Sequence, residues 1–386
     1  MGEVIHLKIA FICTEKLPVP PISGGAIQLY IEGILPYLSQ HHEITLFSIK
    51  DPRLRDFEVK DNVRYIRLPG GDRISYVNSL KKVIRDEFDL IHVFNRPLSL
   101  VELSEELPNT KFSLSLHNEM FAPEKINDKD AKKCVARAEF ITTVSKFIAE
   151  GVRKRCPEAE KKLKVVYSGV DINEYKAKWS EEGIANEKAL KSKYHLKKYK
   201  VVLFVGRLSM KKGAHVLLKA MKKVMRRRRD VALMVVGSRG FGDNKPDEYT
   251  RSLQHIARRL RGPVVFTGFL KPTEICAYYD LADVFVCPSQ WEEPLARVHY
   301  EAMAAGVPII TTNRGGNAEV VSGYGNGIVL KEYTDDEVLA GHIRYLLENP
   351  HKSLAMGMEG RKLAEDKFTW ERVAKDLLEV FQTVRQ

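Results

Sequence analysis

The sequence lacks long apolar runs and paired cysteines, and each absence excludes a class of protein. No stretch of about 18 or more consecutive apolar residues occurs, so a membrane-spanning helix is not expected. The five cysteines are odd in number and form no Cys-x-x-Cys pair, which argues against a disulfide framework and favours reduced thiols in a cytoplasmic protein. No basic leader precedes the first apolar residues, so we also expect no signal peptide.

Length and positive charge are what the sequence has in quantity. Its 386 residues, 44% of them hydrophobic, are enough for two domains of ordinary size. The net charge of +12 is densest at residues 222–229, before Asp230. Because cations are favoured near a helix carboxyl end, this cluster fits a solvated helix end, and a docking face for an anionic surface stays open as the alternative. No aromatic-studded basic groove accompanies it, so no nucleic-acid partner is expected.

Short apolar segments alternate with helical segments through both halves of the chain. In the first half we expect strands at residues 7–13, 44–48, 63–67, 90–94, 111–116 and 140–144, with a helix at 26–40. In the second half we expect strands at residues 201–205, 232–236, 264–267, 284–287, 308–312 and 328–330. This alternation predicts an α/β fold with two doubly wound, Rossmann-like domains.

The boundary between the domains is marked by composition. Residues 171–200 are rich in Lys, Glu and Ser and poor in long apolar side chains, which is typical of a linker. We therefore expect an N-terminal domain over residues 1–172, a linker region over 173–200 and a C-terminal domain over 201–370. Two such domains are expected to face each other across a cleft, the usual place for a small ligand.

The most informative stretch is residues 288–306, which joins an apolar strand to a segment rich in helix formers. It carries two acidic residues eight positions apart, Glu293 in the turn and Glu301 one to two turns into the expected helix. In open α/β sheets, ligands bind beyond the carboxyl ends of the strands, where helix amino termini present N–H groups. Both carboxylates are therefore expected to face one ligand site.

This stretch, with Gly306-Val307-Pro308 and then Gly315-Gly316 and Glu319, resembles the family 4 retaining glycosyltransferases of the GT-B fold. The order of residues in this stretch is most similar to that of the branch that contains the bacterial spore-coat SA proteins. Association with the spore coat therefore stays open as an alternative to a purely cytoplasmic location. The resemblance covers nearly the whole chain and is most specific in its second half. It implies an acceptor-side N-terminal domain, a nucleotide-sugar donor domain at 201–370, and a last helix, about 371–386, that packs back on the first domain.

A second motif, at residues 206–213, follows the strand at 201–205. Gly206 allows a sharp turn, and Arg207 and Lys212 are cations that can converge on one anion. A solvated strand-to-helix turn is the alternative, but the resemblance implies that Arg207 and Lys212 hold the donor diphosphate. Lys211 does not align with the motif lysine. The paired Gly24 and Gly25 before the first helix are a weaker phosphate-binding signal of the same kind.

His117 follows the strand at 111–116, where a side chain lies over the ligand edge of a sheet. The resemblance implies that His117 contacts the donor sugar. Ser145 and the turn 169–171 also match family patterns, and the turn is expected to shape the hinge between the domains. Metal binding is poorly supported. Asp128 and Asp130 have Asp-x-Asp spacing but follow no apolar strand, so we expect no metal and no cofactor.

The function that the resemblance implies is retaining transfer of a sugar from a nucleotide-diphosphate donor, with a UDP-sugar expected, to an unidentified acceptor hydroxyl. Arg207, Lys212 and the backbone of 296–298 would stabilise the departing diphosphate. Glu301 would accept from the ribose hydroxyls, and Glu293 would hold the sugar. The remaining donor contacts are expected at Pro294, Leu295, Ala296, Arg297 and Val298.

Many family members have glycine where this chain has Ala296. The alanine methyl group could narrow the donor pocket, so the identity of the donor sugar is left open. A nucleotide-sugar epimerase of related fold and a coat or scaffold protein that retains the fold stay open as alternatives. The oligomeric state is not predicted.

Overall fold

The computed structural model describes residues 6–240 and 246–385, which divide into two compact units. Unit 1 consists of residues up to Gly169 together with the segment from Trp370, and unit 2 is Val170–Thr369. The chain first passes from unit 1 to unit 2 between residues 169 and 170, within the turn 169–171 that the family resemblance marked as a hinge. It returns to unit 1 between residues 369 and 370. Across the described residues we find no helix with both the length and the apolar character that crossing a bilayer requires.

Unit 1 is built on an eight-stranded sheet of order β3-β4-β2-β1-β5-β6-β7-β8, parallel except for the β3–β4 pair. Its strands are β1 Lys8–Ile12, β2 Glu43–Ile49, β3 Phe57–Lys60, β4 Val63–Leu68, β5 Leu90–Phe94, β6 Lys111–Leu116, β7 Ala138–Thr143 and β8 Leu163–Val165. Its helices are α1 Ala26–Leu38, α2 Arg73–Val83, α3 Pro97–Glu106, α4 Asp128–Arg137, α5 Lys146–Arg155 and α13 Trp370–Gln382. The predicted parallel sheet is confirmed, with β3 and β8 as added edge strands.

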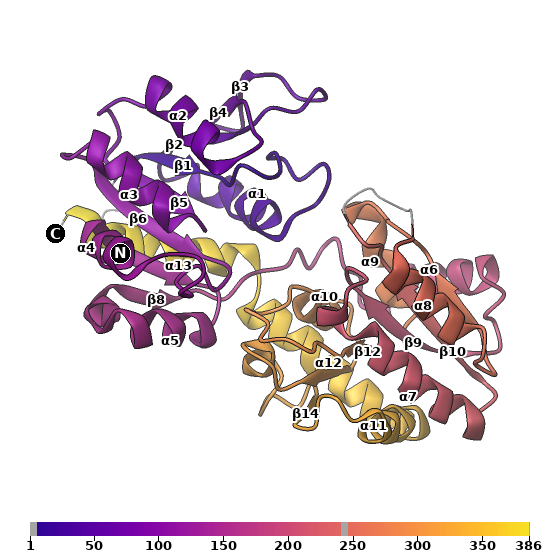
Figure 1. Cartoon of the computed structure of the whole chain (residues 1–386). Helices are drawn as coiled ribbons and strands as arrows, with labels where there is room; N and C mark the ends of the chain where they lie inside the picture. Colours follow the sequence, from indigo (N-terminus) through magenta and orange to yellow (C-terminus); the bar gives the residue numbers. More distant parts are fainter. Residues whose placement is uncertain (1–5, 241–245, 386) are drawn as a thin grey trace. The chain divides into compact units, whose positions relative to one another are not determined.

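Helix α13 comes from the far end of the chain and packs among the helices of unit 1 (Figure 1). Val373, Leu377 and Phe381 are spaced by four residues and lie in one hydrophobic cluster with Phe11 of β1. The Trp370 ring leaves no room at Gly33, where an added Cβ would lie 2.2 Å from a ring carbon. Any larger residue at position 33 would push α13 away from α1.

Unit 2 is built on a six-stranded, wholly parallel sheet of order β11-β10-β9-β12-β13-β14. Its strands are β9 Lys200–Val205, β10 Val231–Val236, β11 Val264–Phe266, β12 Val284–Cys287, β13 Ile309–Thr312 and β14 Gly327–Leu330. Its helices are α6 Glu181–Lys193, α7 Ala214–Arg227, α8 Glu248–Ala257, α9 Pro272–Asp280, α10 Val298–Ala304, α11 Asp336–Glu348 and α12 Pro350–Lys367. Every predicted strand of this half is present.

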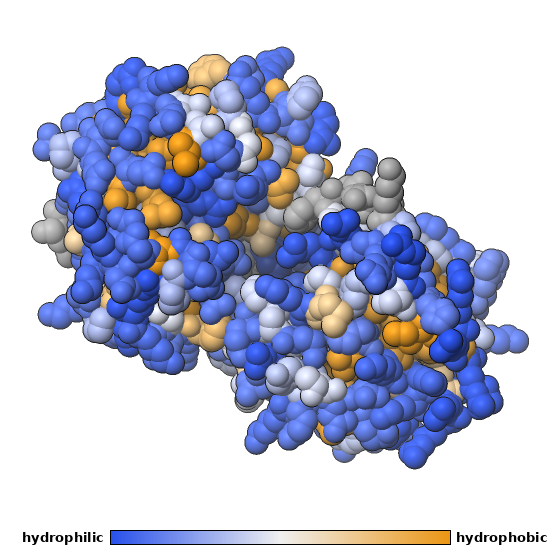
Figure 2. Space-filling model, viewed as in Figure 1, coloured by the Kyte–Doolittle hydropathy of each residue, from blue (hydrophilic) through white to orange (hydrophobic). Residues whose placement is uncertain are grey.

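The expected linker region differs from the structure. Residues 181–193 of it form α6, which is capped by Ser180 and packs against α9 within unit 2. Polar composition misled the interpretation because only one residue of this helix, Gly183, is buried. The face of both units that Figure 2 shows is mostly hydrophilic, with apolar residues in small separate areas.

Candidate donor-binding site

The candidate site lies at the carboxyl edge of the unit 2 sheet. Strands β9, β12 and β13 are neighbours in that sheet, so the segments that follow them meet at one edge. These segments are the turn 206–213, the stretch 288–297 and residues 313–317. They contain Arg207, Lys212, Glu293 and the predicted donor residues 294–297, and the predicted Val298 and Glu301 follow in α10.

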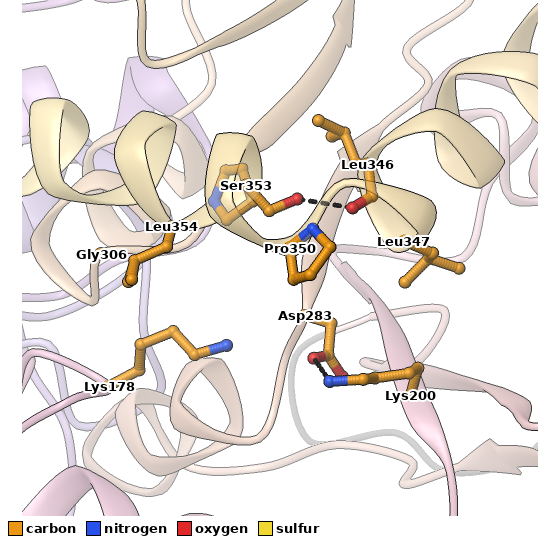
Figure 3. Close-up of a pocket in the computed structure, with 10 residues that line it drawn as sticks. Lys178, Lys200, Asp283, Gly306, Leu346, Leu347, Pro350, Ser353 and Leu354 are labelled. Atoms are coloured by element: carbon orange, nitrogen blue, oxygen red, sulfur yellow. Dashed lines mark hydrogen bonds and ion pairs between the residues drawn. The ribbon is translucent and has the colours of Figure 1, made fainter.

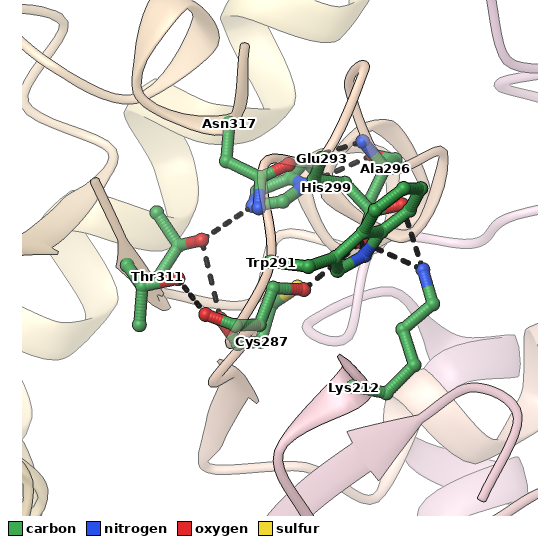
Figure 4. Close-up of polar contacts among 10 residues, drawn as sticks. Lys212, Cys287, Trp291, Glu293, Ala296, His299, Thr311 and Asn317 are labelled. Atoms are coloured by element: carbon green, nitrogen blue, oxygen red, sulfur yellow. Dashed lines mark hydrogen bonds and ion pairs between the residues drawn. The ribbon is translucent and has the colours of Figure 1, made fainter. Parts of the chain in front are cut away.

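Glu293 and Lys212 form an ion pair at the centre of this edge (Figure 4). The Lys212 Nζ lies 2.7 Å from Glu293 Oε1 and 2.8 Å from Oε2. The Trp291 indole Nε1 donates to Oε2 at 2.8 Å, and the Ser289 hydroxyl donates to the same atom at 3.1 Å. With only 6% of Glu293 exposed, these donors and the lysine charge compensate a carboxylate that burial would otherwise destabilise.

Two glycines bring the three segments together. An added Cβ at Gly213, whose φ is +76°, would lie 1.9 Å from the Pro288 carbonyl oxygen. One at Gly315, whose φ is +59°, would lie 2.0 Å from the Glu293 carbonyl oxygen, and the Gly316 N–H donates to that same oxygen at 2.8 Å. Only glycine at positions 213 and 315 permits these close approaches, because any side chain would clash with the facing carbonyl oxygen. The approaches fix the backbone around Glu293.

Ala296 is held by a buried polar network behind the loop (Figure 4). Its N–H donates to Asn317 Oδ1 at 3.1 Å, and its carbonyl lies 2.9 Å from His299 Nδ1. Because a carbonyl only accepts, Nδ1 carries the proton, and His299 Nε2 accepts from the Thr311 hydroxyl at 2.8 Å. Burial lowers the pKa of His299 to about 4, so the ring is neutral and serves as a structural support for the loop.

Glu301 occupies a separate position and has its own partner. It lies in the first turn of α10, which begins at Val298, so the expectation of one to two turns into the helix is corrected. The Tyr279 hydroxyl donates to Glu301 Oε2 at 2.9 Å. Burial raises the pKa of Glu301, while the Arg297 charge and the Tyr279 hydrogen bond act in the opposite direction. Among the described residues, no hydrogen bond reaches its other oxygen, Oε1.

The remaining donor-side predictions fall around this core. Pro294, Leu295, Ala296 and Arg297 lie between Glu293 and the first helical residue, Val298. Arg207 follows Gly206, whose φ is +155°, and its exposed side chain makes no hydrogen bond or ion pair with the described residues. Lys211 points elsewhere than Lys212, since its Nζ lies over the Trp291 ring at 4.6 Å.

His117 lies in unit 1, directly after β6. Its Nε2 is 3.1 Å from the Ser115 hydroxyl, and its ring meets the Tyr30 ring edge to face at 4.7 Å between centroids. The Asn95 side chain accepts from the His117 N–H at 3.0 Å, which fixes the turn. Contact of His117 with a donor sugar stays a prediction.

The other unit 1 matches are local supports in this structure. Gly24 and Gly25 have positive φ values and precede the first residue of α1. The Ser145 side chain accepts from the Ile148 N–H and so caps α5. Asp128 also has a structural role, because Arg155 binds it at 2.7 Å at the start of α4. In residues 6–240 and 246–385, no group of three His, Cys, Asp or Glu side chains could hold a metal.

Several residues of the site were not singled out from the sequence. Trp291 and Tyr279 donate to the two key carboxylates, and Asn317 supports the Ala296 backbone. Trp291 lies two residues before Glu293, which was an available signal. Tyr279 lies in α9, 22 residues before Glu301, and only the fold brings it there.

A small cavity of about 90 Å³ lies at the opposite edge of the same sheet (Figure 3). Lys200 and Asp283, which form an ion pair at 3.0 Å, stand at the amino ends of β9 and β12. This volume is well below the several hundred cubic ångströms of a typical ligand pocket, so the cavity is not a candidate donor site.

Comparisons with known proteins identify the family of the chain. Residues 186–363 match the family described as group 1 glycosyl transferases, and residues 27–174 match glycosyltransferase family 4. The chain is 44% identical over 380 residues to spore coat protein SA of Bacillus subtilis, covering 98% of this chain and 100% of that protein. It is also 44% identical to the putative glycosyltransferase YtcC of the same organism, covering 98% of this chain and 92% of that one.

A solved structure of HepE from Anabaena in complex with UDP-glucose superposes with a TM-score of 0.79 at 22% identity, covering 98% of this chain and 100% of that one. This likeness shows the fold, two Rossmann-like domains of the GT-B type. With both family models matched and 44% identity over nearly its whole length, the chain belongs to the family 4 glycosyltransferases of the GT-B fold.

Proposed function

We propose that this chain is a retaining hexosyltransferase that uses a UDP-sugar and an acceptor hydroxyl, without a metal ion. The observation that carries the proposal is the Lys212–Glu293 ion pair at the ligand edge of the unit 2 sheet, beside the start of α10. Transfer releases a diphosphate whose negative charge grows as the glycosidic bond breaks, and fixed cations stabilise such a charge. Lys212 uses its bonds to Glu293 for position and retains donor capacity for the diphosphate, since an ammonium has three N–H donors.

The two carboxylates have different tasks in this proposal. Tyr279 occupies Glu301 Oε2, so Oε1 is the oxygen that would accept from a ribose hydroxyl. Glu293 would accept from hydroxyls of the transferred sugar while Trp291, Ser289 and Lys212 fix its orientation. Arg207, exposed after Gly206, would add a second cation to the diphosphate.

The donor base is the first quantity to measure. We expect UDP and UDP-sugars to raise the melting temperature more than the corresponding GDP, ADP or TDP compounds. A ligand at 100 times its Kd stabilises a fold by about 2.7 kcal/mol, which a thermal-shift assay detects easily. A larger shift with GDP-sugars would overturn the assignment of UDP as the donor nucleotide but would still support a sugar transferase. No shift with any nucleotide sugar would favour the coat or scaffold alternative, which the name of the Bacillus subtilis relative keeps open.

Metal independence is tested by chelation. With Lys212 and Arg207 as the cations on the diphosphate, excess EDTA should leave the initial rate of transfer nearly unchanged. Loss of activity in EDTA that Mg²⁺ or Mn²⁺ restores would contradict the lysine and arginine assignment. Asp128→Asn is the matched variant, because Arg155 already occupies that carboxylate and the substitution should not alter the rate.

A further inference from the structure

One face of α7 carries a row of cations that the donor site does not use. Lys219, Lys222, Lys223 and Arg226 are spaced by three and four residues and therefore share one side of the helix, which we name the basic face. The opposite side is buried in the unit 2 core through residues such as Leu217, Met221 and Val224. The basic face is therefore fixed toward the outside of unit 2.

Helix α7 packs against α8 (Figure 1). A cavity of about 350 Å³ lies along the basic face. Arg259, just beyond the end of α8, adds a cation from the α8 side of the cavity. Among the described lining residues, Ile256 is the apolar one. The cavity is lined by Lys219, Lys222, Lys223, Arg226, Ile256, Arg259 and Asp336. Five of its seven lining residues are therefore positively charged.

Most of these cations have no acidic partner. Lys223 is bound by Asp336 at 3.0 Å and by Glu337 at 2.8 Å. Lys219, Lys222, Arg226 and Arg259 make no hydrogen bond or ion pair with the described residues. Among the described residues, Asp336 in the lining and Glu337 beside it are the carboxylates that bind Lys223. Five cations against these two carboxylates leave an excess of three positive charges for an anion.

The helix dipole does not account for this arrangement. Cations are favoured in the last turn of a helix, which holds Arg226 and Arg227. Lys219 and Lys222 lie further inside α7, which runs from Ala214 to Arg227. Pairs of like charge four residues apart, such as Lys222 and Arg226, destabilise an isolated helix. The solvated helix end therefore explains only part of the cluster.

We propose that the basic face docks unit 2 on a lipid bilayer that contains anionic phospholipids, with a phosphate headgroup held in the cavity. Each Lys or Arg close to such a surface adds attraction, and several act together because a bilayer presents many phosphates within a Debye length. Nucleic acid fits less well, since none of the described residues that line the cavity is aromatic and could stack on a base. This proposal is independent of sugar transfer, because none of its residues belongs to the donor site.

The test uses the full chain and two kinds of vesicle, phosphatidylcholine alone and an equal mixture with phosphatidylglycerol. We expect co-sedimentation with the mixed vesicles only, and less of it as salt is raised. Removing a cation is expected to weaken binding about fivefold, so the triple variant Lys219→Gln, Lys222→Gln, Arg226→Gln should bind about 10²-fold more weakly. Its melting temperature and its sugar transfer in solution should match those of the wild type.

A charge-matched control separates the basic face from net charge alone. Lys129, Lys197 and Lys198 are exposed lysines elsewhere on the chain, and their replacement by Gln changes the net charge equally. The control should retain most of the vesicle binding. Equal loss in both triple variants, or no binding to the mixed vesicles, would overturn the proposal. Tighter binding to short duplex DNA would also overturn it by identifying a different anion. Free pyrophosphate is expected at the donor site, so it would overturn the proposal only if the triple variant lost tight pyrophosphate binding that the wild type shows without vesicles.

Discussion

Lys212→Ala will reduce sugar transfer about 10²-fold or more. Charge-assisted hydrogen bonds contribute roughly 1.5–3 kcal/mol each, and more where charge develops in the transition state. The measurement is kcat and kcat/KM for the donor that the thermal-shift comparison selects. Lys211→Ala is the matched control, because this neighbouring cation lies over the Trp291 ring at 4.6 Å and is not assigned to the diphosphate. Wild-type turnover in folded Lys212→Ala would contradict the proposed role.

The ion pair complicates this variant in a way that can be measured. Removing Lys212 leaves the Glu293 carboxylate buried without its cation, and breaking a buried pair costs about 3–5 kcal/mol of stability. The double variant Lys212→Ala, Glu293→Gln removes that uncompensated charge. We expect it to recover melting temperature relative to Lys212→Ala and to remain inactive. Recovery of both quantities would mean that Lys212 acts only by stabilising Glu293.

The strands were predictable because parallel strands in the centre of a sheet are apolar on both faces. Leu90–Phe94, Lys111–Leu116 and Val284–Cys287 were expected at the bounds that the structure has. The two missed strands lie at sheet edges. Phe57–Lys60 and Leu163–Val165 contain no fully buried residue, so they lack the apolar signal. Helix α6 escaped notice for the same reason, since its exposure makes its sequence resemble that of a linker.

For the candidate site, the sequence indicates residues that are close to one another in the chain. Residues 288–306 indicate Glu293 and Glu301 as candidates, because this segment follows a strand and contains a turn and the start of a helix, where ligands bind in such sheets. The direct bond between Lys212 and Glu293 was not predicted, because it spans 81 residues and depends on β9 and β12 being neighbours. Tyr279 was missed because nothing in the local pattern of α9 distinguishes a tyrosine that donates to a carboxylate from one that fills the core.

Glu301→Gln will weaken binding of free UDP about tenfold while Glu293→Gln will leave it unchanged or tighter. UDP carries the ribose but no sugar, so a residue that accepts from the ribose affects it and a residue that holds the sugar does not. Burial raises the pKa of Glu301, so the charged form is already disfavoured and the neutral amide should not destabilise the fold. Glu293→Gln frees Lys212 from its counter-charge, which should favour the diphosphate. Isothermal titration with UDP measures both affinities.

The kinetic constants should separate in the same way. The ribose is unchanged during transfer, so Glu301→Gln should raise the donor KM with a smaller change in kcat, because binding is lost equally in the ground and transition states. A sugar held by Glu293, as proposed, would change charge and shape as its bond to phosphate breaks, so Glu293→Gln should act mainly on kcat. Equal melting temperatures for the two variants would exclude misfolding as the cause. If Glu293→Gln lost UDP affinity while Glu301→Gln kept it, the two assignments would be exchanged, and Tyr279 would then orient the carboxylate that holds the sugar.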